Sequence, residues 1–176
     1  MTVLGQLHLV SAFVAMATGA VVLILRPKGA RWHRRLGWLY VGSMLMLNLS
    51  SLLIYRLFGG FGPFHAMALV SLVGIVMGTL SGRRARRSRE SRQPHARAGL
   101  VEAHYLWMTW AYVGLIAAFA SETITRYPAF RPVLGGGRLF GVAVAAATLV
   151  IVGIGSQWIR RRKTHLLAPF RVSSPN

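Results

Sequence analysis

Residues 31–55 read RWHRRLGWLYVGSMLMLNLSSLLIY, and this stretch decides the fold. A basic cluster is followed by the uncharged run Leu36–Tyr55. At 1.5 Å per residue, a helix of about 20 residues crosses a bilayer. A helix is expected because an open strand would leave backbone N–H and C=O groups unpaired in lipid. The stretch therefore predicts a transmembrane helix whose basic end lies at a membrane surface.

Four further uncharged runs have similar lengths: Met1–Leu25, Leu57–Gly82, Ala103–Ser121 and Leu139–Ile159. Hydrophobic residues make up 54% of the 176, which is typical of a membrane protein. The prediction is an all-α integral membrane protein with a single domain, built around an up-down four-helix bundle. Its five transmembrane helices are expected at about 3–25, 35–57, 62–80, 100–121 and 139–159. A basic loop at 81–99 and a basic tail at 160–176 complete the chain.

The basic residues also predict an orientation. Seventeen of the 21 lysines and arginines fall on the first connection, the third connection and the tail. By the positive-inside rule these segments are cytoplasmic, so the N-terminus is outside and the C-terminus inside. The expected location is the bacterial cytoplasmic (inner) membrane, crossed several times. The same clustering accounts for the net charge of +18, so no nucleic-acid partner is expected.

Four histidines occur at two depths of this predicted bundle. His8 and His65 lie near the outer ends of the first and third helices, and His33 and His104 near the inner ends of the second and fourth. In an up-down bundle the first and third helices are diagonal partners, as are the second and fourth. Each pair would therefore face across the bundle, as a bis-histidine haem requires. The pattern predicts haem b, with two copies if both pairs act as iron ligands.

Each of the four histidines, taken alone, also fits a purely structural role. An imidazole near a membrane surface can bond to backbone, headgroups or water. Zinc or copper is less favoured, since the histidines lie at two levels instead of in one cluster. The absence of cysteine excludes disulfides, iron–sulfur clusters and thiolate catalysis. No catalytic residue is assigned, and enzymatic activity stays an open question. Glu102 and Glu122 are interpreted as charge balance for nearby arginines.

Gly74 and Gly78 form a GxxxG motif, GIVMG. Such motifs let two transmembrane helices approach closely. The expected partner is either the predicted fifth helix or a helix of another membrane protein. The fifth helix carries no histidine and is expected to pack outside the four-helix core.

Two short segments carry a resemblance: HRRLG at 33–37 and GFGPFH at 60–65, supported by LH at 7–8 and HYLWMTWAY at 104–112. Over about residues 4–126 the chain resembles a bacterial family of predicted multi-pass integral-membrane proteins of unknown function. In that family basic residues usually follow the fourth-helix histidine, whereas Tyr105 and Leu106 follow it here. The histidine spacing is also similar to that of small di-haem b-type membrane cytochromes.

Two hypotheses of function follow. The first is a membrane b-type haem protein that carries electrons, with a quinone or a redox protein as partner. The second is a non-catalytic accessory subunit that stabilises a larger membrane protein complex. A small transporter is a weaker third hypothesis, because no broken helix or mid-membrane charge supports it.

Overall fold

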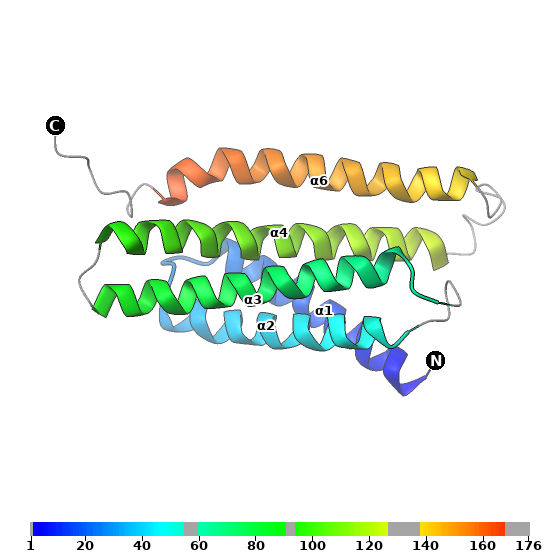
Figure 1. Ribbon diagram of the computed structural model, residues 1–176, viewed down its shortest axis with the longest axis horizontal. Helices are drawn as coiled ribbons and strands as arrows, with labels where there is room; N and C mark the ends of the chain where they lie inside the picture. Colours follow the sequence, from blue (N-terminus) through cyan, green and yellow to red (C-terminus); the bar gives the residue numbers. More distant parts are fainter. Residues whose placement is uncertain (1, 55–59, 91–93, 127–137, 168–176) are drawn as a thin grey trace.

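The computed structural model describes residues 2–54, 60–90, 94–126 and 138–167, and these residues are helical apart from short connections. The helices are α1 (Val3–Ile24), α2 (Arg31–Leu52), α3 (Pro63–Glu90), α4 (Pro94–Arg126) and α6 (Arg138–Leu167) (Figure 1). Within these ranges there is no strand, which confirms the predicted all-α class.

Three of these helices contain segments long and apolar enough to cross a membrane: Val3–Ile24, Phe64–Ser88 and Gly141–Lys163. The prediction of a membrane protein is thereby supported for α1, α3 and α6. The full count of five spans is not confirmed. α2 and α4 are not among these candidate spans: the first turn of α2 is basic, and α4 carries two glutamates. The orientation across the membrane stays a prediction.

The segment predicted as a basic loop, 81–99, is instead largely helical. α3 continues to Glu90 and α4 begins at Pro94. Arginine is a good helix former, and a helix can place its guanidinium groups in water while burying another face. Ala85 shows this, since it is only 6% exposed although Arg84 beside it is exposed. A cluster of arginines therefore marks where a helix leaves the apolar layer and does not mark where the helix ends.

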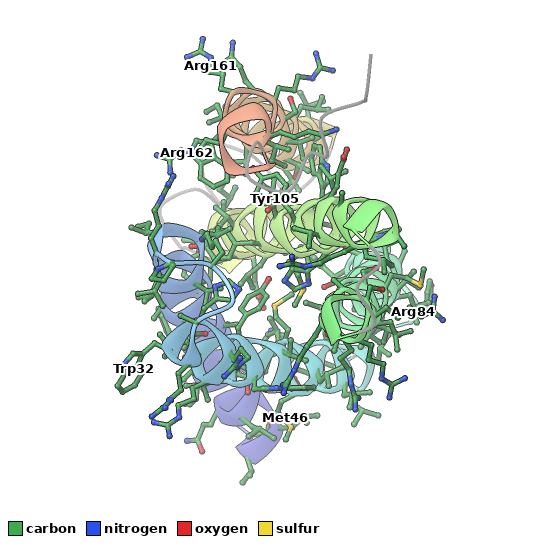
Figure 2. The ribbon with its side chains drawn as sticks, turned by 90° about the vertical axis from the view of Figure 1, so that its left-hand side faces the viewer. Trp32, Met46, Arg84, Tyr105, Arg161 and Arg162 are labelled. Carbon is green, nitrogen blue, oxygen red and sulfur yellow. The ribbon has the colours of Figure 1, made fainter. Side chains whose placement is uncertain are left out.

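The first four helices form a bundle in which sequence neighbours run antiparallel (Figure 1). α3 packs along α4, α1 along α2 and α2 against α3, and a smaller contact between α1 and α4 closes the ring. α6 packs against α4 from outside this ring, as expected for the last helix (Figure 2). α1 thus lies diagonally across from α3, and α2 across from α4. We call the end where α1 starts the N-terminal end and the opposite end the basic end.

Two tyrosines fill the centre of the bundle, one from α2 and one from α4. The rings of Tyr40 and Tyr112 lie 6.4 Å apart between centroids, and the Tyr112 hydroxyl donates to the Met16 carbonyl at 3.2 Å. A Cβ on Gly19 would lie 2.5 Å from the Tyr112 ring and 2.9 Å from the Tyr40 ring. Only glycine leaves room there. The close approach of α1 to these rings therefore depends on a missing side chain.

The GxxxG face of α3 is covered by α4. A Cβ on Gly78 would lie 2.8 Å from Met108 Sδ and 3.1 Å from Trp107 Cβ, and one on Gly74 would lie 3.8 Å from Ala111 Cβ. This corrects the expected partner, because neither the last helix nor another protein can occupy a face that α4 already fills. The motif serves the internal packing of the bundle.

Replacing Gly78 by leucine tests this packing. The added side chain overfills the α3–α4 contact, which costs about 1–3 kcal/mol in a well-packed core. We expect the purified variant in detergent to unfold at a temperature several degrees below wild type. Gly153→Leu is the matched control, because nothing lies within 4 Å of a Cβ there. Equal melting temperatures for the two variants would show that α4 does not pack tightly on Gly78.

The orientation can be tested with single cysteines, because the natural chain has none. A cysteine at Ser88, in the basic extension of α3, should be shielded from a membrane-impermeant thiol reagent in intact cells. A cysteine at Thr2 should be labelled. The reverse labelling pattern would invert the topology that the positive charges predict.

Candidate functional site

A cavity of about 440 Å³ lies toward the N-terminal end of the bundle, and all four bundle helices contribute to it. Both His8 of α1 and His65 of α3 line it, so two of the predicted ligands share one cavity. Polar groups of Asn48, Ser71 and Glu122 also line it, and most of the remaining lining is apolar. Its volume falls in the range of small-molecule sites.

Hydrogen bonding fixes the protonation of His8. Its Nδ1 lies 3.1 Å from Ser50 Oγ, and that hydroxyl donates to the Leu47 carbonyl at 2.9 Å. Because a hydroxyl has one proton, Ser50 accepts from His8, and Nδ1 carries the hydrogen. In the neutral imidazole the lone pair is then on Nε2. Metal-binding histidines show the same arrangement, in which a neighbour holds the non-ligating nitrogen.

Glu122 stands beside this lone pair. Its Oε2 lies 3.6 Å from His8 Nε2. Two acceptors at this distance attract each other only when a proton or a cation lies between them. The pair therefore marks a place where a positive charge is stabilised at the polar side of the cavity.

His65 has a different environment. It is 3% exposed, its ring stacks on Phe61, and its Nδ1 accepts the Gly62 N–H at 3.0 Å. Gly62 precedes the first helical residue, Pro63, so the His65 side chain satisfies a backbone donor at the start of α3. His65 therefore has a structural role, which is to cap the start of α3. In this arrangement its proton is on Nε2, and ligation through Nε2 requires the proton to move to Nδ1.

The other predicted pair lies toward the basic end. His104 Nδ1 donates to the Gly78 carbonyl at 2.8 Å, which leaves the lone pair on Nε2. A Cβ on Gly82 would lie 2.7 Å from that Nδ1, so glycine makes room for the ring. His33 Nδ1 is buried, and it has no hydrogen-bond partner within the described ranges. His104 thus has the same ligand-ready tautomer as His8.

His33 precedes the apolar run that begins at Leu36. Burial is the main cause that lowers the pKa of His33 to about 4, and the positive charge of Lys28 and the proximity of His104 contribute. His33 is therefore neutral at pH 7. A neutral imidazole is the form that binds a metal. His104 is among the groups that act on His33, so the two imidazoles interact electrostatically at the basic end.

Several neighbours of these histidines have roles that the sequence pattern does not predict. Glu122 is expected to balance nearby arginines, and the structure also places it beside His8 in the cavity. The predicted bundle does contain a signal for this contact. In an antiparallel bundle the end of α4, with Glu122, lies beside the start of α1, with His8. Glu102 forms an ion pair with Lys163 of α6, a lysine where arginines were predicted. Nothing in the local sequence indicates that Ser50 bonds to His8 or that Lys28 acts on His33.

Metal binding by three or more side chains is not supported within the described ranges, since no group of three histidine, aspartate or glutamate residues converges there. A haem iron differs, because it needs only one or two axial protein ligands.

Comparison with known proteins identifies a family but no individual relative. No curated protein and no solved structure matches the chain. Residues 5–159 match a family described as "Predicted membrane protein (DUF2306)". The match covers most of the chain and agrees with the resemblance to membrane proteins of unknown function. The chain therefore belongs to the DUF2306 family of predicted membrane proteins.

Proposed function

We propose that the protein is a membrane b-type haem protein that carries electrons. The observation that supports this most is the cavity shared by His8 and His65, which reach it from the diagonal helices α1 and α3. A bound haem would supply one-electron redox chemistry there. His8 and His65 would hold it, and the pair His33 and His104 would hold a second.

The residues at the N-terminal end fit this role after two local changes, one at His65 and one at Glu122. Ser50 holds the orientation of the His8 ring, and Nε2 would be available to iron once the proton or cation shared with Glu122 has left. For His65 the proton must move to Nδ1, which gives up the bond from Gly62 N–H. That bond contributes about 1 kcal/mol, a small cost beside a metal–ligand bond. Glu122 must then turn away from His8 Nε2, which places a carboxylate at the edge of the site.

The cavity walls also suit a flat apolar group. Small residues from three helices line the cavity: Ala12, Gly74, Ala111, Gly114 and Ala118. Apolar walls exclude water, and solvent exclusion is one of the means by which a protein sets a haem potential.

The two histidine levels would form a path along the bundle. On α3, His65 and the Gly78 carbonyl that holds His104 are separated by about 20 Å at 1.5 Å per residue. Tyr40 and Tyr112 lie between the levels and are in the packed centre. This arrangement would carry electrons between the two halves of the bundle. A quinone or a redox protein is the proposed partner class.

The second candidate is a non-catalytic accessory subunit of a larger membrane complex. The exposed apolar side chains of α6, such as Leu149 and Ile154, favour it, because another transmembrane helix would cover them. Lipid covers such a face equally well, so haem content decides between the two candidates.

The visible spectrum of the purified protein separates the candidates. We expect a reduced-minus-oxidised difference spectrum of b-type haem, with one or two haems per chain by pigment extraction. The protein is expressed with an added haem precursor, so that haem supply does not limit the haem content of the purified protein. A folded, helical protein without haem under these conditions would exclude the cytochrome and favour the accessory subunit.

Single histidine changes then assign the ligands. We expect His65→Ala to remove or shift one spectral component and His33→Ala to remove or shift the other, because each iron loses an axial ligand. His165→Ala, near the end of α6, is the matched control and should leave the spectrum unchanged. If both components persist in all four ligand variants, the ligand assignment is wrong although haem is present.

A further inference from the structure

Three cations gather at the basic end, where α6 comes near the connection between α1 and α2. They are Arg26 and Lys28 of that connection and Arg162 of α6. Arg26 and Lys28 are two residues apart in the sequence, and Arg162 lies on the side of α6 that faces the bundle near α1 (Figure 2). In agreement with this placement, burial lowers the pKa of Lys28 and the charges of Arg26 and Arg162 lower it further. The acidic side chain Glu102 is engaged elsewhere, in its ion pair with Lys163. The three positive charges therefore repel one another, and an anion placed among them would relieve this repulsion.

Two of these cations are held in place by the fold. Lys28 Nζ donates to the carbonyls of Val22 and Leu23 at 2.7 and 2.9 Å, at the end of α1. The Arg162 guanidinium lies 5.2 Å from the centre of the Trp158 ring. Figure 2 shows Arg162 on the side of α6 that faces the bundle near α1, whereas Arg161 points away. Stacking on the indole leaves the edge of the guanidinium open for hydrogen bonds to an anion.

The row of side chains leading to Arg162 indicates what kind of anion binds. Val150, Ile154, Trp158 and Arg162 are spaced four residues apart, so they lie along one face of α6. Val150 and Ile154 are 59% and 65% exposed. Moving along this face, apolar surface gives way to an aromatic ring and then to a cation. A phospholipid presents the complementary order, with acyl chains, interface and phosphate.

We propose that Arg26, Lys28 and Arg162 form a binding site for the headgroup of an anionic phospholipid in the leaflet at the basic end. The phosphate accepts hydrogen bonds from the two exposed guanidinium groups. The Lys28 ammonium adds a fixed positive charge, and an acyl chain lies on the apolar row of α6. The site does not depend on haem binding.

The test is lipid retention by the purified protein, measured by native mass spectrometry. Protein in a neutral detergent is titrated with phosphatidylglycerol or with phosphatidylcholine. We expect phosphatidylglycerol to bind and phosphatidylcholine to bind at least tenfold more weakly. The variant R26Q/R162Q should lose at least tenfold in affinity for phosphatidylglycerol, since each basic residue near an anionic surface contributes appreciably. Circular dichroism checks that the variant remains helical.

The control variant is R83Q/R84Q, which removes two exposed arginines of α3 at the same, basic end of the bundle. It should change the affinity by less than about threefold, a loss much smaller than that of two specific contacts. Equal losses in the two variants would show general attraction to a basic surface and overturn the site. Displacement of the lipid by millimolar inorganic phosphate would also overturn it, because the site would then recognise a free anion. The variant R26K/R162K keeps the charges, and it should bind better than R26Q/R162Q if the site exists.

Discussion

A bilayer interior offers almost no hydrogen-bond partners, and the rest of this structure follows from that constraint. The backbone satisfies itself within long helices, and several polar side chains inside the bundle bond to a neighbouring helix. His8 reaches Ser50 of α2, His104 reaches the Gly78 carbonyl of α3, and Tyr112 reaches the Met16 carbonyl of α1. These bonds link α1 with α2, α3 with α4 and α1 with α4. They also fix which imidazole nitrogen carries the proton, and so which one can bind a ligand.

Glycine decides how closely the helices approach. Gly19 admits the two central tyrosines, Gly78 admits Met108, and Gly82 admits the ring of His104. The bundle is thus tightly filled around His104 and in its centre, and it holds a cavity near His8 and His65. The end with His8 and His65 therefore has space for a ligand, whereas a haem held by His33 and His104 would require the close packing around His104 to open.

The sequence predicted some levels of this structure and missed others. Uncharged runs predicted the helical class and the membrane character, because hydrophobic length is a property of the local sequence. The same runs placed the end of α3 at about residue 80, ten residues early, because arginines leave the apolar layer without ending a helix. The pairing of His8 with Glu122 required knowing how α4 lies against α1. The pair Gly62-Pro63 indicates that His65 lies at the start of a helix. The spacing of the four histidines instead predicted that His65 is an iron ligand. Haem binding itself stays a prediction.

The central proposal is that a haem iron lies between His8 and His65. The most direct measurement is electron paramagnetic resonance of the oxidised, purified protein, compared with His8→Ala. We predict a low-spin ferric signal from two axial imidazoles, of which at least one component converts to high spin in the variant. A spectrum without ferric haem, or a low-spin signal that the variant leaves unchanged, would contradict it.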